Sequence, residues 1–256
     1  MNTLSSSRPT GTNLRPALRL LGALALLTVV GAPALHAQAA PATANSAAVP
    51  TLRNDWLTRH EKFNAIAKQG GVNLLFVGDS ITDFWGSGSR GKPVWDKRYA
   101  PLKAANFGIS GDRTEHVLWR LQNGNLDGIQ PKVVVLMIGT NNLPADNTPA
   151  QIAEGVAAIL KEIHTRCPAS KVLLLGVFPR GEKANNPARA PIAEINRLIG
   201  KFDDGKQVHF LDIGAKFLTP DGTLTKEIMA DALHPGLAGY QIWADAMQPK
   251  LDELLK

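Results

Sequence analysis

Short apolar runs alternate along the chain with stretches whose apolar residues recur at helical spacing. The apolar runs fall at residues 74–77, 104–107, 132–138, 172–175 and 208–211. Continuous apolar runs of this length are typical of strands that are buried on both faces of a sheet. We therefore predict five strands.

The stretches between these runs predict helices. The expected helices cover residues 51–68, 114–122, 149–164, 191–202 and 237–255, the last despite Pro249 near its end. Thr148 is a good N-cap, and Pro149 suits the first helical position after it. Strands that alternate with amphipathic helices indicate an α/β domain with a parallel sheet and helices on both faces.

Three of the predicted strands end in polar corners. Gly78-Asp79-Ser80 follows the first strand, Gly108 ends the second, and Asn141 follows the third. Right-handed crossovers place the carboxyl ends of parallel strands along one edge of the sheet, where open α/β sheets bind their ligands. We expect these three corners to share one crevice.

The first 39 residues have a different pattern. Three arginines stand before or at the start of an apolar run at residues 20–30, and Ala37-Gln38-Ala39 fits a small-residue cleavage site. The run is shorter than the roughly 20 apolar residues that cross a bilayer. We therefore predict a secretory signal peptide and an exported protein, periplasmic or secreted, with no stable membrane insertion after cleavage. An uncleaved membrane anchor is the alternative.

After the leader, residues 40–50 are rich in Ala, Pro, Ser and Thr, and we expect them to form a disordered tether. Residues 51–256 then form the predicted domain. Cleavage after Ala39 would leave 217 residues, which suits one α/β domain with a sizeable core.

The charge of the chain gives little indication of a charged partner. Removing the leader takes away three arginines and no acid, so the net charge falls from +6 to +3. No run of Lys and Arg is present, and we predict no nucleic-acid partner. Cys167 is the only cysteine, so an internal disulfide is impossible, and we expect it to pack as a small apolar residue near a helix end.

Ser80 is the candidate nucleophile. A serine hydroxyl is a poor nucleophile at neutral pH, so it needs a histidine to take its proton and usually a carboxylate to orient that histidine. The sequence Asp231-Ala232-Leu233-His234 offers both groups, three residues apart, so that they can share one side of a turn. The competing interpretation is that His234 caps the last helix and Asp231 pairs with a surface cation.

The remaining histidines that follow the leader are less suited to act as the base. His60, His116 and His164 fall in predicted helices, and His209 lies inside the fifth strand. His234 is therefore the predicted base.

An acyl-transfer enzyme must also stabilise the oxyanion of its tetrahedral intermediate. We predict the backbone N–H groups of Ser80 and Gly108 and the side-chain amide of Asn141 as donors, with glycine at 108 allowing the backbone to approach the substrate. An ordinary turn asparagine is the alternative for Asn141. For Asp79 we favour a structural role in holding the corner over a direct role in catalysis.

Two motifs resemble other sites and are rejected. Gly86-Ser87-Gly88-Ser89-Arg90-Gly91 spells G-x-G-x-x-G, but we expect this loop neither to follow a strand nor to open a helix. A rim beside the site, shaped by Trp85 and Trp95, is its expected role. Ser110 lacks the G-x-S-x-G spacing of a nucleophile elbow. No group of residues has metal-ligand spacing, so we predict neither metal nor cofactor.

The polar corners and the Asp-x-x-His sequence match, in order, the four sequence blocks of the SGNH (GDSL-type) hydrolases. Residues 106–114, 116–121 and 179–183 further resemble the catalytic subunits of intracellular platelet-activating factor acetylhydrolase. The resemblance covers essentially the whole chain after the leader. It implies a flavodoxin-like three-layer α/β/α sandwich with a metal-independent serine esterase site, and the same roles for Ser80, Gly108, Asn141, Asp231 and His234.

The predicted function is an exported serine esterase that removes short acyl groups, acetyl above all. Because an exported acetylesterase commonly meets glycans, the first substrate expected is an O-acetylated carbohydrate; a lipid or simple ester is the alternative. The related subunits are cytosolic, so their lipid substrate is not carried over to a chain that looks exported. A non-catalytic ligand-binding protein with the same crevice is the alternative of another class. Related subunits pair, which leaves a homodimer open.

Overall fold

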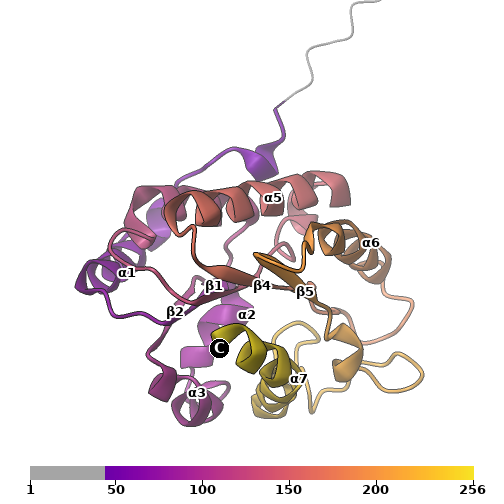
Figure 1. Ribbon diagram of the computed structural model, residues 1–256. Helices are drawn as coiled ribbons and strands as arrows, with labels where there is room; N and C mark the ends of the chain where they lie inside the picture. The colour runs from indigo at the N-terminus through magenta and orange to yellow at the C-terminus, as the bar shows by residue number, and fades with distance from the viewer. Residues whose placement is uncertain (1–43) are drawn as a thin grey trace, which may run out of the picture. The chain divides into compact units, whose positions relative to one another are not determined.

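The computed structural model describes residues 44–256. Five parallel strands form one sheet in the order β2-β1-β3-β4-β5 (Figure 1). The strands are β1 (Leu74–Gly78), β2 (Ala104–Gly108), β3 (Val133–Met137), β4 (Lys171–Leu175) and β5 (Val208–Leu211). This is the flavodoxin-like strand order. It confirms the predicted fold class and all five predicted strands.

Helices cover both faces of the sheet (Figure 1). They are α1 (Leu57–Gln69), α2 (Ser80–Asp83), α3 (Lys92–Arg98), α4 (Thr114–Arg120), α5 (Pro149–Arg166), α6 (Arg189–Ile199) and α7 (Leu237–Leu255). The helices α1, α4, α5 and α6 pack with one apolar cluster, and α2, α3 and α7 pack with the other. Residues of β1 alternate between the two clusters, because successive side chains of a strand point to opposite faces.

Most predicted helix bounds agree with the structure to within a few residues. The helix α7 has the predicted bounds and tolerates Pro249. The helix α5 begins as expected, because the Thr148 hydroxyl accepts the Gln151 N–H and the Gln151 side chain accepts the Thr148 N–H. Cys167 is buried at the C-cap of α5, as predicted. The helices α2 and α3 were not predicted; α2 has only 4 residues, which is too few to show a helical period.

Residues 44–50 correct the predicted tether. The carbonyl oxygen of Ala47 accepts the Thr114 hydroxyl at 2.7 Å, and the Asn45 amide donates to the Gln151 carbonyl at 2.9 Å. Ala47 is fully buried, and Gly155 of α5 leaves room for it, since a Cβ there would lie 2.4 Å from the Ala47 oxygen. A disordered tether up to residue 50 is therefore wrong for this segment, which packs on the domain.

The predicted signal peptide at residues 1–39 lies outside the described residues and stays a prediction. Across residues 44–256, no helix combines the length and the apolar character that spanning a membrane requires.

Candidate active site

Ser80 follows the central strand β1 in a corner that requires glycine before it. A Cβ at Gly78 would lie 2.2 Å from the Thr82 hydroxyl oxygen and 2.4 Å from the Met137 carbonyl oxygen. The Asp79 carboxylate accepts the Ile81 N–H at 2.9 Å and caps α2. Asp79 therefore has the structural contact that was predicted, and Ser80 becomes the first residue of α2.

Ser80, His234 and Asp231 form a continuous chain of hydrogen bonds. The Ser80 Oγ lies 2.9 Å from His234 Nε2, and His234 Nδ1 lies 2.7 Å from Asp231 Oδ2. The ring of Phe84 packs against the imidazole, with 5.2 Å between ring centroids. The structure thus brings together the three residues that the sequence proposed as nucleophile, base and orienting carboxylate.

The turn that carries Asp231 and His234 is held by its own backbone. Asp231 Oδ1 accepts the backbone N–H groups of Leu233 and His234, at 3.1 and 2.7 Å. Partial burial acts to raise the pKa of Asp231, but these hydrogen bonds and the imidazole outweigh it and lower the pKa to about 2. Asp231 is therefore an anion at neutral pH, as an orienting carboxylate must be.

Ala232, between these residues, has a left-handed backbone with φ of 54°. Such a conformation costs a non-glycine residue roughly 1 kcal/mol or more. Two backbone hydrogen bonds hold it, from Gly181 N–H to the Ala232 oxygen and from Ala232 N–H to the Met229 oxygen, both at 2.8 Å. The strain sits in the turn that aims His234 at Ser80.

The second oxygen of the Asp79 carboxylate is buried without a hydrogen-bond partner among the described residues. Asp79 is fully buried, and this burial raises its pKa to about 7, opposed by the Ile81 N–H. Burial thus favours the acid form of Asp79, the residue that precedes the candidate nucleophile, at pH values where an exposed aspartate is an anion.

Asn141 lies across the switch point of the sheet from Ser80. Strands β1 and β3 are neighbours although β2 lies between them in sequence, and a crevice opens where the chain changes direction in this way. Asn141 follows β3, and its side-chain amide donates one N–H to the Asp112 carbonyl at 3.0 Å. Within residues 44–256 the second N–H of this amide has no protein acceptor, so it can donate to a ligand.

Gly108 does not have the environment that its predicted role requires. Its N–H donates to Asn106 Oδ1 at 3.0 Å, and a Cβ at this position would lie 2.2 Å from the Asp83 nitrogen. Glycine is needed here because the end of β2 packs directly on the backbone of α2. The prediction that Gly108 opens the way for substrate is corrected on this point.

Gly111, three residues further, was missed by the sequence reasoning. It has φ of 81°, and within the described residues its N–H donates to no protein acceptor. It precedes Asp112, the residue whose carbonyl orients Asn141. The second glycine of Gly108-Ile109-Ser110-Gly111 was the available signal, because turns that need a positive φ favour glycine.

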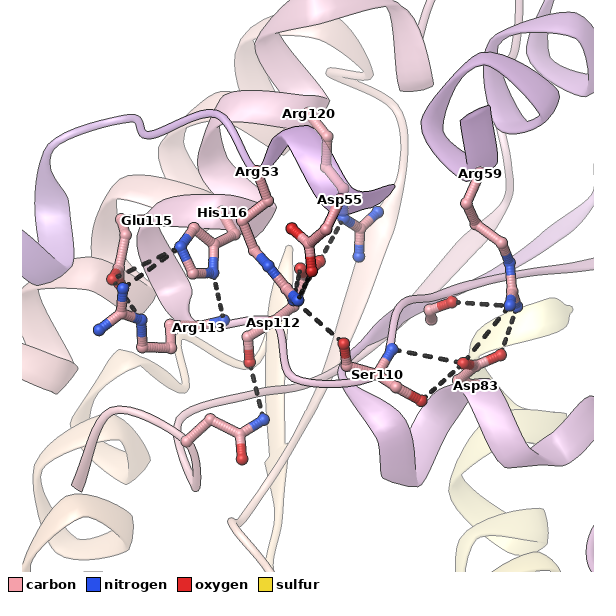
Figure 2. A network of polar contacts seen from close by, with 12 residues as sticks. Arg53, Asp55, Arg59, Asp83, Ser110, Asp112, Arg113, Glu115, His116 and Arg120 are labelled. Atoms are coloured by element: carbon pink, nitrogen blue, oxygen red, sulfur yellow. Dashed lines mark hydrogen bonds and ion pairs between the residues drawn. The ribbon is translucent and has the colours of Figure 1, made fainter. Parts of the chain in front are cut away.

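A buried polar network fixes the loop that carries Gly111 and Asp112. The Asp112 carboxylate pairs with Arg53 at 3.0 Å and with Arg120 at 2.9 Å, and Arg120 also donates to the Gly78 carbonyl at 3.1 Å. Figure 2 shows Arg53 reaching both Asp112 and the Ser110 carbonyl. These contacts tie the loop to the corner before Ser80.

Ser110, rejected as a nucleophile, has a structural role. Its hydroxyl donates to the Asp83 carboxylate at 2.8 Å, and Arg59 pairs with the same carboxylate (Figure 2). The other histidines also lie in the predicted elements: His60 in α1, His116 in α4, His164 in α5 and His209 in β5.

The loop at residues 86–91 differs from its prediction in two respects. It leads directly into α3, so the expectation that it opens no helix is wrong, although it does follow the short helix Phe84–Gly86 and not a strand. Trp85 is fully buried in the core, and Trp95 packs against the same cluster, so neither shapes a rim. Arg90 stacks on Phe84, with its guanidinium carbon 4.6 Å from the ring centroid.

Among residues 44–256, no three His, Cys, Asp or Glu side chains are grouped to hold a metal ion. His234 and Asp231, which could each bind a metal ion, are hydrogen-bonded to each other.

This fold and this constellation of residues are those of an ester-hydrolysing enzyme. Residues 76–242 match the GDSL-like lipase/acylhydrolase family, and the chain belongs to this family. The protein is therefore a carboxylic ester hydrolase.

Two relatives show where the chain lies within this class. It is 40% identical over 203 residues to platelet-activating factor acetylhydrolase IB subunit alpha2 from Rattus norvegicus, covering 77% of this chain and 86% of the relative. It is 37% identical over 218 residues to the alpha1 subunit from Homo sapiens, covering 82% and 91%.

Solved structures share the fold. A GDSL-like lipase from Bacteroides thetaiotaomicron superposes with a TM-score of 0.58 at 22% identity, covering 77% of this chain and 97% of the other. An acetylxylan esterase from Geobacillus stearothermophilus superposes with a TM-score of 0.54 at 23% identity, covering 71% and 94%.

Proposed function

We propose that this enzyme hydrolyses short-chain esters, acetyl esters above all, through an acyl-enzyme intermediate on Ser80. The observation that carries this proposal is the unbroken chain of hydrogen bonds from Asp231 through His234 to Ser80. In this assignment Ser80 is the nucleophile, His234 is the general base and acid, and Asp231 holds the imidazole in the required tautomer.

In the first half of the reaction, Ser80 Oγ attacks the ester carbonyl while His234 Nε2 takes the hydroxyl proton. The tetrahedral oxyanion accepts hydrogen bonds from the Ser80 N–H, the Gly111 N–H and the Asn141 amide. Gly111, and not Gly108, is assigned as the second backbone donor, because the Gly108 N–H already donates to Asn106. The intermediate collapses as His234 returns the proton to the leaving alcohol.

In the second half, water takes the place of the alcohol. His234 removes a proton from the water as it attacks the acyl-enzyme, and a second oxyanion forms in the same position. Its collapse releases the carboxylic acid and restores the Ser80 hydroxyl. Each half therefore uses the same base and the same donors.

We further propose that the protein is exported and that its first substrate class is O-acetylated carbohydrate. The arginines, the short apolar run and the Ala37-Gln38-Ala39 sequence support export. A fold neighbour named as an acetylxylan esterase is compatible with a glycan ester. Recovery of the protein outside the cytoplasm with a new N-terminus near residue 40 is the expected result, and retention of the intact leader in the cytoplasm would contradict export.

A lipid or simple-ester substrate is the second candidate. The relatives named as platelet-activating factor acetylhydrolase subunits favour it, at up to 41% identity over most of both chains.

A panel of esters tests the reaction and separates the substrates. The wild type is assayed on p-nitrophenyl esters of rising chain length, acetylated xylan and acetylated sialic acid, beside a Ser80→Ala variant. We expect the variant to lose roughly 10⁴-fold or more in kcat, as removal of a catalytic serine does in other enzymes. A variant that hydrolyses p-nitrophenyl acetate at the wild-type rate would falsify the assignment of Ser80.

A further inference from the structure

A groove of about 500 Å³ lies directly beside the Asp231–His234 turn. Loops that follow β3 and β4 line it together with the turn itself. Its apolar lining includes Leu143, Pro187 and Leu233, and its polar side chains are Arg180, Asn186 and Asp231. The groove shares Asp231, Ala232 and Leu233 with the turn that carries His234, so it adjoins the candidate active site on the Asp231 side of the imidazole.

Arg180 is a cation without an acidic partner in this groove. Within the described residues it forms no ion pair, and its guanidinium donates only to the carbonyl and hydroxyl oxygens of Thr140, at the long distances of 3.3 and 3.4 Å. By contrast, Arg53, Arg59 and Arg120 of the nearby network each pair with a carboxylate. Most of the five guanidinium N–H donors of Arg180 are therefore available to a ligand.

The backbone at Arg180 is held in place from the opposite side. The Arg189 side chain donates to the Arg180 and Gly181 carbonyls, both at 2.9 Å, and the Gly181 N–H donates to the Ala232 carbonyl. The loop is thus fastened to the catalytic turn. Arg180 contacts Thr140, the residue that directly precedes Asn141, so one side of the groove adjoins the chain segment that carries Asn141.

The one carboxylate that lines the groove is already occupied. Both oxygens of Asp231 accept hydrogen bonds from His234. When His234 takes the Ser80 proton, the imidazolium and Asp231 together become neutral, and the positive charge of Arg180 is then uncompensated within the groove. Repulsion of an anionic ligand by Asp231 is smallest at that point.

We propose that Arg180 binds an anionic group, a phosphate or a carboxylate, carried on the alcohol part of the ester substrate. This inference rests on the proposed esterase reaction at Ser80 and names the substrate class that it favours. A planar guanidinium matches both oxyanions with paired N–H donors. The apolar lining of the groove accommodates the part of the alcohol between the ester and the anion.

The test uses matched pairs of acetyl esters that differ only in charge. One pair is O-acetylated sialic acid and its carboxyl methyl ester; the other is acetylglycerol phosphate and acetylglycerol. We expect the wild type to prefer the charged member of at least one pair by roughly tenfold or more in kcat/KM, the scale of a hydrogen bond to a charged group. The responding pair distinguishes a carboxylate from a phosphate.

Variants then assign the preference to Arg180. In Arg180→Ala the ratio of charged to neutral kcat/KM falls to about one, and Arg180→Lys restores part of it. Lys183→Ala is the matched control, because it removes the same charge from the same loop outside the groove, and its ratio stays within about twofold of the wild type. An equal fall of the ratio in Lys183→Ala would overturn the proposal, since the general field and not a groove contact would then be responsible.

Binding provides a readout that does not depend on turnover. In a Ser80→Ala background, calorimetry is expected to show tighter binding of the charged ester than of its neutral partner, and loss of the difference when Arg180→Ala is added. If the wild type hydrolyses neutral esters but shows no charge preference in either measurement, this inference fails and the proposed function stands. If the wild type hydrolyses no ester, the proposed function fails, and the binding difference alone decides whether Arg180 holds an anion.

Discussion

The two sides of the active site are built in opposite ways. The turn with Asp231 and His234 is partly exposed and is ordered mainly by hydrogen bonds between residues two or three apart, with one longer-range hydrogen bond from the Gly181 N–H to the Ala232 oxygen. The loop with Gly111 and Asp112 is ordered by Arg53 and Arg120, and its central carboxylate is buried. Local geometry therefore sets the base, whereas packing of the whole domain sets the oxyanion loop. We expect changes in the turn to reduce activity and changes in the network to reduce stability first.

The largest effect is expected from Asp231→Asn in the turn. The amide cannot stabilise the imidazolium and favours the wrong tautomer, which costs roughly 10⁴-fold in kcat in a related triad. Steady-state kinetics on p-nitrophenyl acetate measure the loss, and the melting temperature is expected to stay close to that of the wild type. Asp245→Asn on α7, which breaks a partly exposed ion pair with Arg98 of α3, is the matched control and is expected to keep its activity. A large fall in the melting temperature of Asp231→Asn would contradict the expectation that changes in the turn reduce activity and not stability.

In the network, Arg120→Met leaves Asp112 buried with Arg53 alone. Removing one partner of a buried ion pair costs about 3 to 5 kcal/mol in unfolding free energy. Urea unfolding measures this loss. Arg197→Met breaks an exposed pair with Glu194 on α6 and is expected to cost less than about 1 kcal/mol. Equal losses of unfolding free energy in the two variants would show that the buried Asp112 network stabilises the fold no more than an exposed ion pair does.

Asn141 and Asn142 repeat the contrast in adjacent residues. Asn141→Ala removes the proposed oxyanion donor and is expected to lower kcat by roughly 10²- to 10³-fold with little change in KM. The Asn142 side chain is buried among Thr114, Glu115 and Asn147, so Asn142→Ala is expected to lower the unfolding free energy by about 1 to 3 kcal/mol. Kinetics and urea unfolding of both variants show whether function and stability separate between them. A fall in stability without a fall in kcat for Asn141→Ala would exclude its donor role.

The last prediction concerns Asp79, which precedes Ser80 and caps α2. Its pKa is raised from 3.8 to about 7 on folding, so the folded state holds a proton that the unfolded state has released, and stability from this group is lost as pH rises. From pH 5 to pH 8 this loss amounts to roughly 2 to 3 kcal/mol. Relative to the wild type, Asp79→Asn is therefore expected to gain stability over this range in urea unfolding. If the difference in unfolding free energy between Asp79→Asn and the wild type stays constant from pH 5 to pH 8, Asp79 does not titrate in this range.

The sequence predicted the turn with Asp231 and His234 but much less of the loop with Gly111 and Asp112. The chain positions of the strands follow from apolar runs, and Asp231 and His234 are linked by spacing alone. Arg53 and Arg120 carry no local signal, because they reach Asp112 only after α1, α4 and the sheet have packed. The space around Gly108 and Gly111 likewise depends on α2, a helix too short for its period to be recognised. Residues 45–48 were misjudged because small residues that suit a linker also fit the gap above Gly155.

The distance along the chain between Ser80 and His234 has a consequence for biosynthesis. These hydrogen-bonded residues are 154 positions apart, and every strand of the sheet is synthesised before the base. The Tyr240 hydroxyl of α7 donates to the Ile81 carbonyl at 2.6 Å, so docking of this late helix also steadies the nucleophile. A growing chain can complete its sheet while remaining inert. Ser80 and His234 can therefore form their hydrogen bond only after the turn before α7 has folded onto the completed sheet.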